Sequence, residues 1–359
     1  MSQFSYQDYC GKAAGTDRLV GKPDHLRLLA MGMFGEVGGI AAELKKRRRE
    51  GAAYAARQQL LLEEVGDVLW YMGRLFSLIS PHSIPGLTEL KLTKVQSTDG
   101  ILLTASLCSV AAEVLKAVVD GDDLRTTKTL VSAWKSLREF CLCMEIDIAR
   151  AAEMNIEKTS GRWRQSAEFY PLFDHGFPEE ETLPRQLKIE FKETGGGGRT
   201  SVILRYGKVN LGDRLTDNIS QGDYYRFHDV FHLAYAVFLG WSPVTRSLLH
   251  CKRKSDPGID ENEDGARAAI VEEAISATIF SHAVRMSLYE GVDSIDSNLL
   301  KLIVQLVQGY EVDRLPMWQW EIAILEGFRV FRQMRKNRGG VVTLDLEKRD
   351  LGYDAPSAS

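Results

Sequence analysis

Apolar side chains recur at every third or fourth position along most of the chain, which is the spacing of one face of a helix. The pattern is clearest at residues 24–49, where we expect a long amphipathic helix that ends in the basic run 45–49 and Gly51. A second helix is expected at residues 53–79. Further helical segments begin near Ile101 and occupy residues 130–148 and 151–162, so four or more helices are predicted before residue 165.

The pattern changes after Phe169, where three prolines mark a linker. Apolar and charged residues then alternate at 187–191 and again at 202–206, with glycines at 195–198 between them, which predicts a β-hairpin. Helical spacing returns beyond the hairpin, at residues 224–239, 266–288, 299–310 and 317–335. The tail after Gly339 is expected to be loosely held.

These patterns predict a mainly α fold with an N-terminal all-α helical bundle, a β-hairpin connector and a second, C-terminal helical domain. Pro81 and Pro85 are expected to end the second helix, and residues 84–144 form an insert within the bundle. A weak similarity between residues 40–45 and 110–116 leaves an internal duplication open. The predicted parts are the bundle at 1–165, the linker with its hairpin at 166–222, the helical domain at 223–338 and the flexible tail at 339–359.

Net charge, the lack of long apolar runs and the scattered cysteines limit which classes of protein this sequence can belong to. The 359 residues carry a net charge of -4, so no global basic excess points to nucleic acid. No signal-peptide pattern and no stretch of about 18 apolar residues is evident, so a cytoplasmic protein without a membrane segment is expected. The five cysteines are scattered and are interpreted as reduced thiols.

Two pairs of acidic residues lie beside the apolar stripes of the first two helices. Glu36 and Glu43 are seven residues apart, and Glu64 and Asp67 are three apart, so each pair projects from one side of its helix. If the two helices pack antiparallel, four carboxylates meet at the edge of a core, where their repulsion favours a bound cation. Oxygen ligands of this kind select magnesium, manganese or calcium. The alternative is that these are solvated surface charges.

The segments that carry the acids resemble the MazG family of all-α nucleoside triphosphate pyrophosphohydrolases. These segments are Phe34–Gly39 (FGEVGG), Glu43–Lys46 (ELKK) and Leu61–Tyr71 (LLEEVGDVLWY). The family signature is E-x-x-E, a spacer and E-x-x-D, and its second half is intact at Glu64 and Asp67. In the first half Glu36 is present, but Gly39 stands where the family has a glutamate, and Glu43 is one turn further along the same face. Asn155–Trp163 resembles the family's later phosphate-facing helix.

The resemblance implies a helical bundle, assembled as a homodimer or tetramer, that binds a nucleoside triphosphate through Mg²⁺, with Mn²⁺ as an alternative. Water would cleave the anhydride between the α- and β-phosphates to give a monophosphate and pyrophosphate. A cation held by carboxylates neutralises phosphate charge, and a spare carboxylate accepts the proton of the attacking water. The expected roles are catalysis for Glu36, Glu64 and Asp67, metal binding for Glu36, Glu43, Glu64 and Asp67, and phosphate binding for Lys45, Asn155, Lys158 and Arg162.

The C-terminal region contains a second candidate metal site. His228 and His232 are four residues apart on an expected helix, a spacing that lets both rings reach one ion. Glu272, Glu273 or His282 could supply further ligands. The alternative is that the two histidines are simply hydrogen-bonded near the core. The stretches Gly240–Pro243, Lys252–Pro257 and Gly265–Glu273 resemble the C-terminal domain fused to some MazG-like proteins, without implying a second activity.

Three hypotheses follow. The first is a nucleotide pyrophosphohydrolase. The second is a catalytically weakened nucleotide- or metal-binding regulatory protein that acts through its C-terminal domain. In the third, the C-terminal domain is the enzyme through His228 and His232, and the first domain is a dimerisation bundle.

Overall fold

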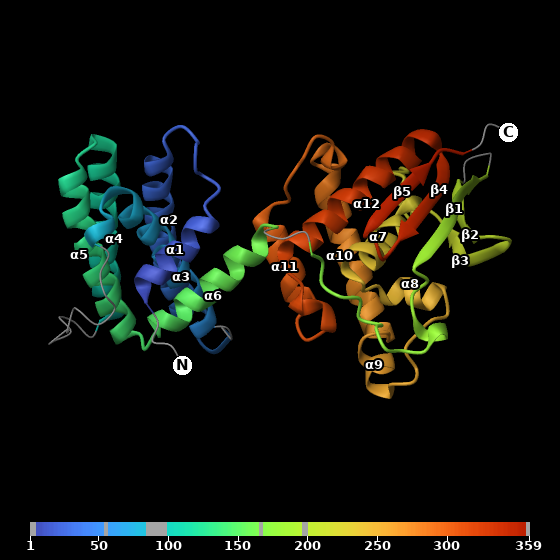
Figure 1. Ribbon diagram of the computed structural model, residues 1–359, viewed down its shortest axis with the longest axis horizontal. Helices are drawn as coiled ribbons and strands as arrows, with labels where there is room; N and C mark the ends of the chain where they lie inside the picture. The colour runs from blue at the N-terminus through green and yellow to red at the C-terminus, as the bar shows by residue number, and fades with distance from the viewer. Residues whose placement is uncertain (1–4, 54–56, 84–98, 165–167, 196–199, 357–359) are drawn as a thin grey trace. The chain divides into compact units, whose positions relative to one another are not determined.

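The computed structural model describes residues 5–53, 57–83, 99–164, 168–195 and 200–356. Pro85, the start of the expected insert and the glycines at 196–198 lie outside these residues. The chain divides into two compact units, Met1–Trp163 and Arg164–Ser359 (Figure 1). Each unit has its own hydrophobic core.

The described part of the first unit is helical. Two short 3₁₀ turns, Gly51–Ala53 and Pro81–Ser83, follow its second and third helices. Its α-helices are α1 (Tyr6–Gly15), α2 (His25–Glu50), α3 (Arg57–Ile79), α4 (Gly100–Asp120), α5 (Asp123–Cys143) and α6 (Ile148–Arg162).

Helices α2 and α3 pack on each other through the stripes seen in the sequence. Met33, Val37 and Ile40 of α2 are fully buried, as are Val65 and Val68 of α3. Burial of each such side chain stabilises the fold by about 1.5–3 kcal/mol. This packing places the acidic residues of both helices beside a shared core.

Helices α4 and α5 form a tight antiparallel pair. Gly121 ends α4 with φ 71°, a left-handed conformation that glycine adopts without strain, and the Asp122 side chain caps α5 by accepting from the Arg125 amide. By length and composition α4 could cross a membrane. In the bundle it packs against α2 and α5, where Leu107, Ala111 and other side chains are buried.

The second unit combines a sheet with six α-helices in its described part. Four 3₁₀ turns accompany these elements: Glu179–Glu181 precedes the first strand, and Tyr225–Phe227, Ser287–Tyr289 and Glu311–Arg314 lie between later elements. In chain order the strands and helices are β1 (Gln186–Thr194), β2 (Ser201–Tyr206), β3 (Val209–Leu215), α7 (Asp229–Leu239), α8 (Pro243–Leu248), α9 (Pro257–Asn262), α10 (Ala266–Val284), α11 (Ser297–Leu306), α12 (Met317–Asn337), β4 (Gly339–Asp345) and β5 (Asp350–Asp354).

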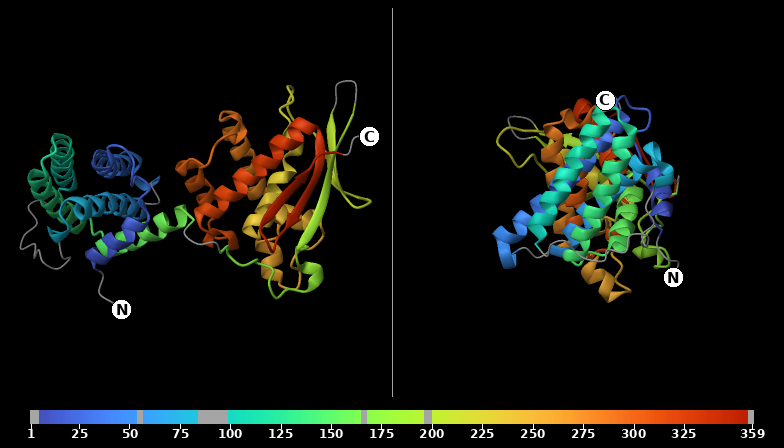
Figure 2. Two further views of the ribbon diagram at one scale, coloured as in Figure 1. Left: turned by 45° about the horizontal axis from the view of Figure 1, so that its top comes forward. Right: turned by 90° about the vertical axis from the view of Figure 1, so that its left-hand side faces the viewer.

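The five strands form one antiparallel sheet in the order β3-β2-β1-β4-β5. Burial alternates along β1, with Leu187, Ile189 and Phe191 inward, because one face of the sheet meets the core. Helices α7 and α12 contact β4 and β5 on that face, and Figure 2 shows the helices of this unit gathered on one side of the sheet.

The mainly α fold is confirmed, with two corrections. The hairpin is not a connector, because β1 and β2 belong to the sheet of the second unit. The expectation of a loose tail after Gly339 is wrong, because Val342 and Leu344 are buried and pair with Ile189 and Leu187 of β1. A short alternation of apolar and polar residues does not by itself predict a strand, because the partner strand cannot be identified from the sequence.

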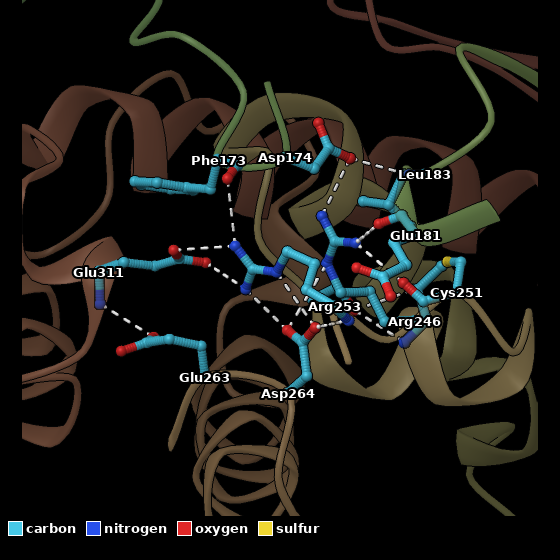
Figure 3. Close-up of polar contacts among 12 residues, drawn as sticks. Phe173, Asp174, Glu181, Leu183, Arg246, Cys251, Arg253, Glu263, Asp264 and Glu311 are labelled. Carbon is cyan, nitrogen blue, oxygen red and sulfur yellow. Dashed lines mark hydrogen bonds and ion pairs between the residues drawn. The ribbon is translucent and has the colours of Figure 1, made fainter. Parts of the chain in front are cut away.

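A buried ionic network joins α8 and the segments on either side of α9 to residues near 174 and 311 (Figure 3). Arg246 of α8 bonds to Asp174 at 3.0 Å. Arg253 donates to Asp264 at 2.7 Å and to Glu311 at 2.6 Å. All five side chains are at least nine-tenths buried, so each charge depends on its partners.

Candidate functional sites

In the first unit, Glu64 of α3 lies directly against Gly39 of α2. A Cβ added to Gly39 would overlap the Glu64 carboxylate. The absence of a side chain at residue 39 therefore makes room for the carboxylate of the neighbouring helix. Gly39, which differs from the family signature, is therefore in contact with Glu64, the first acid of the intact half of that signature.

Glu43, one turn beyond Gly39 on α2, is 5% exposed. Its Oε1 accepts from Lys46 Nζ at 2.5 Å. Its Oε2 is buried and has no hydrogen-bond partner within the described residues. Glu43 raises the pKa of Lys46, and Glu64 adds to the effect, so both carboxylates act on the same ammonium group. A buried, unpartnered carboxylate oxygen beside a second acid fits a site for a cation.

Asp67, one turn after Glu64, is joined to α6. Its Oδ1 accepts from Asn155 Nδ2 at 2.7 Å, and both carboxylate oxygens lie 2.5 Å from Lys158 Nζ. The same ammonium reaches Glu63 at 3.2 Å. The structure thus brings the acid of α3 and two of the expected phosphate-binding residues together.

The close approach of α3 and α6 depends on Gly66. A Cβ there would lie 2.7 Å from the Ala151 carbonyl oxygen, so only glycine allows this spacing. Helix α1 completes the arrangement, because the Tyr9 hydroxyl donates to Asn155 Oδ1 at 2.9 Å. Tyr9 therefore fixes the Asn155 amide so that its NH₂ group faces Asp67.

Glu36 of α2 is half-buried. The pKa of Tyr71 is raised, first by burial and then by the negative charges of Glu36 and Asp67. The acids of α2 and α3 thus both influence one phenol.

The other two residues predicted to bind phosphate, Lys45 and Arg162, differ in their exposure to solvent. Lys45 is exposed. Arg162 is 8% exposed, and its guanidinium lies 4.1 Å from the centre of the Trp163 ring. Tyr9, Glu63 and Lys46, to which no role was predicted, contact the predicted residues.

The second unit contains a separate cluster at the start of α7. His228, Asp229 and His232 each offer one ligand atom within 4.8 Å of the others. Glu273 of α10 joins them, with Oε1 3.4 Å from His232 Nε2 and Oε2 3.8 Å from His228 Nε2. Within the described residues this is the one group of three or more such side chains that converges so closely.

Glu272 does not face the cluster's centre. Its Oε1 accepts from His232 Nδ1 at 2.9 Å and from the Ser242 hydroxyl at 2.6 Å, and its Oε2 accepts from the Val244 amide at 2.9 Å. Glu272 therefore orients the His232 ring from the side opposite Nε2. His282, the other expected ligand, bonds instead to the Tyr289 hydroxyl at 2.8 Å. Asp229, which the sequence analysis did not assign, takes the place expected for these residues.

Electrostatics in this cluster follow from burial and charge. Burial lowers the pKa of His232, but Glu272 and Glu273 outweigh it and raise that pKa well above its ordinary value. Burial raises the pKa of Asp229. Burial also acts to raise the pKa of Glu273, but His232 outweighs it, so that pKa is lowered. The Glu273 carboxyl is thus more readily ionised than that of Asp229.

A family model described as the MazG C-terminal domain matches residues 168–357, which is most of the second unit and more than half of the chain. The chain belongs to the MazG-like family. Membership in this family connects the MazG-like chain with nucleotide-related function and with enzymes of the nucleotide pyrophosphohydrolase kind. No curated protein and no solved structure matches it.

Proposed function

We propose that the first unit is a Mg²⁺-dependent nucleoside triphosphate pyrophosphohydrolase that converts NTP or dNTP to a monophosphate and pyrophosphate. The observation that carries the proposal is the convergence of three helices, in which Glu64 lies against Gly39 of α2 and Asp67 binds Asn155 and Lys158 of α6. Of the two acids of the intact half-signature, Glu64 thus meets α2, and Asp67 binds the helix that resembles the family's phosphate-facing segment.

In this proposal Glu36, Glu43, Glu64 and Asp67 hold the cation. Mg²⁺, when bound, supplies positive charge that neutralises phosphate oxygens and activates the attacking water. The Oε2 of Glu43, which has no hydrogen-bond partner among the residues that the structure describes, supports a cation at this edge of the core. Lys158 would release Asp67 to the cation and turn to the triphosphate, while Asn155 stays fixed by Tyr9.

The proton of the attacking water needs an acceptor. Glu36, Glu64 and Asp67 are the candidates, and a carboxylate that is not engaged with the cation can take the proton as the bond to the α-phosphorus forms. The oxygen that bridges the α- and β-phosphates then leaves with the pyrophosphate. Lys45 and Arg162 are proposed to neutralise charge on the phosphates from the rim of the site.

The proposal is tested by pyrophosphate release from a panel of ribo- and deoxyribonucleoside triphosphates with Mg²⁺ or Mn²⁺. Glu64→Gln and Asp67→Asn are expected to lower kcat at least about 100-fold, because each removes a charged cation ligand. Glu157→Gln, an exposed acid on α6, is the matched control and should keep full activity. Equal turnover in all four proteins would contradict the proposal.

A second candidate is a nucleotide- or metal-binding regulatory protein with weakened catalysis. Gly39 favours it, because the family glutamate is absent and Glu64 occupies the space. Calorimetry with a non-hydrolysable triphosphate analogue distinguishes the two. Tight, Mg²⁺-dependent binding without pyrophosphate release from any natural triphosphate would select the regulatory role.

We also propose that the bundle assembles as a homodimer or tetramer. Several apolar side chains of α2 are exposed, including Met31 at 58% and Phe34 at 43%. Apolar surface of this kind is commonly buried between subunits. Light scattering coupled to gel filtration measures the mass, and a monomer at micromolar concentration would contradict assembly.

A further inference from the structure

Hydrogen bonds from the Nδ1 atoms fix the orientation of the two histidine rings in the cluster of the second unit. His228 Nδ1 donates to the Tyr225 carbonyl at 2.9 Å, and His232 Nδ1 donates to Glu272 at 2.9 Å. The Tyr225 ring also stacks on His228, with centroids 4.3 Å apart and planes 3° from parallel. With Nδ1 of each ring donating, Nε2 is the atom that can bind a metal ion, and a bound ion replaces any proton there.

The two Nε2 atoms point into a region that also contains carboxylate oxygens. His228 Nε2 is 3.2 Å from Asp229 Oδ1, and His232 Nε2 is 3.4 Å from Glu273 Oε1. Ligand atoms around a tetrahedral ion with bonds of about 2.0–2.1 Å lie about 3.3 Å from one another. These two separations are close to that spacing, and Glu273 Oε2 is somewhat further from His228 Nε2, at 3.8 Å.

His232 Nε2 lies 3.4 Å from Glu273 Oε1 but makes no hydrogen bond with it. The His232 side chain is fully buried, and its Nε2 has no hydrogen-bond partner among the described residues. Buried polar atoms normally have a partner, so an aimed but unpartnered nitrogen points to a ligand. The backing of both imidazoles by a carbonyl or carboxylate is also the arrangement that metal-binding histidines show.

We propose that the second unit binds one divalent transition-metal ion of the zinc class through His228 Nε2, His232 Nε2 and Asp229, with Glu273 as the fourth ligand. Imidazole nitrogens combined with carboxylates favour such ions over Mg²⁺ or Ca²⁺. Glu272 and Tyr225 are positioning residues that act through the rings. The Glu273 side chain is 46% exposed, so the site is reached from solvent on its side.

The site is chemically distinct from the carboxylate cluster of the first unit. That cluster offers oxygen ligands and suits Mg²⁺. The second unit can therefore hold its ion whether or not the first unit hydrolyses nucleotides, and each proposal can fail alone.

The test uses the full chain carrying Glu64→Gln and Asp67→Asn, which weakens the proposed cation site of the first unit. The protein is stripped with a chelator and titrated with Zn²⁺ by calorimetry, and Co²⁺ serves as a second probe through its visible absorption. We expect one ion per chain. Adding His228→Gln should weaken binding at least 100-fold and abolish the Co²⁺ bands that arise from nitrogen coordination.

His282→Gln is the matched control, because it removes an imidazole of α10 that bonds to Tyr289. It should bind Zn²⁺ like its parent. Glu272→Gln should weaken binding about 10–100-fold through the orientation of His232. Glu273→Gln alters a half-exposed side chain and so gives a folded variant even if His228→Gln does not fold; it should weaken binding and shift the Co²⁺ bands. No Zn²⁺ binding by the parent, or unchanged binding in Glu273→Gln and in a folded His228→Gln, would overturn the proposal.

Discussion

Gly39 has no side chain, and this allows the Glu64 carboxylate of α3 to lie directly against α2. Gly39→Ala would push the Glu64 carboxylate away, because the new methyl group needs the space that the carboxylate fills. A displacement of about 1 Å in a catalytic group can cost about 100-fold in rate. We expect kcat for pyrophosphate release to fall by at least tenfold, with a higher Mg²⁺ concentration needed for half-maximal rate.

Gly38→Ala is the matched control, because a Cβ at Gly38 meets nothing within 4 Å. It should leave turnover unchanged and stabilise α2 by up to about 1 kcal/mol, as alanine does in an exposed helix position. Equal rates for the two alanine variants would show that the contact between residue 39 and Glu64 has no bearing on catalysis.

At the same scale, spacing identified Glu64 and Asp67 but could not identify their partners. Helical periodicity shows which side of a helix a residue occupies, whereas the bond between Asp67 and Lys158 joins residues 91 positions apart. Tyr9 was missed for the same reason. Its role depends on which helices meet, and a single sequence does not contain that information.

At the scale of elements, α1 serves the candidate site through one hydroxyl. Tyr9→Phe removes the donor to Asn155, and Tyr6→Phe removes a comparable buried donor to the Leu69 carbonyl at 3.0 Å. Each change should lower the free energy of unfolding by about 1–3 kcal/mol, because a buried acceptor loses its partner. Only Tyr9→Phe should also lower kcat, since Asn155 is then free to turn away from Asp67.

Denaturant unfolding and steady-state kinetics on both variants check this prediction. A loss of kcat in Tyr6→Phe as large as that in Tyr9→Phe would attribute the effect to the general stability of the bundle. An unchanged kcat in Tyr9→Phe would remove α1 from the site.

Long helices were easier to foresee than short elements. The stripes of α2, α3 and α12 extend over several turns, so periodicity identifies them. Helix α8 has six residues and begins at Ser242-Pro243, and β5 has five, so neither contains enough positions for a pattern to stand out. Strands β4 and β5 were mistaken for a loose tail because their stability comes from pairing, of β4 with β1 and of β5 with β4.

At the scale of the whole molecule, breaking the buried network centred on Arg253 should strongly destabilise the second unit. Arg253→Met leaves Asp264 and Glu311 buried without their cation, which costs about 3–5 kcal/mol. For a domain of this size the melting temperature of that unit should fall by roughly 6–20 °C. Lys348→Gln, which alters an exposed ion pair of the same unit, should leave the transition unchanged.

Differential scanning calorimetry of the full chain measures these shifts. Because the two units have separate cores, the transition that belongs to the first unit should stay in place in both variants. A joint shift of every transition would contradict independent unfolding of the units.

Acid should weaken the second unit through Asp174. Burial acts to raise the pKa of this carboxyl, but Arg185, the Leu183 amide and Arg246 outweigh it, so the folded pKa is lowered. Its contribution is therefore complete above the unfolded pKa of about 3.9 and is lost as pH falls through the lower folded value. Asp174→Asn should reduce stability at pH 7 and flatten its decline below about pH 4, as measured by denaturant unfolding across pH. A decline as steep as in the parent would contradict this assignment.

The place of β1 in the sheet has a consequence for how the chain is made. β1 ends at Thr194 and pairs early with β2, but its other neighbour, β4, begins only at Gly339. At about 5–20 residues per second, the ribosome needs on the order of ten seconds to synthesise the intervening segment. During that interval a central strand presents an open edge, which is the surface on which nascent chains aggregate. Synthesis speed between α7 and α12, and not only final stability, should therefore govern the yield of folded protein.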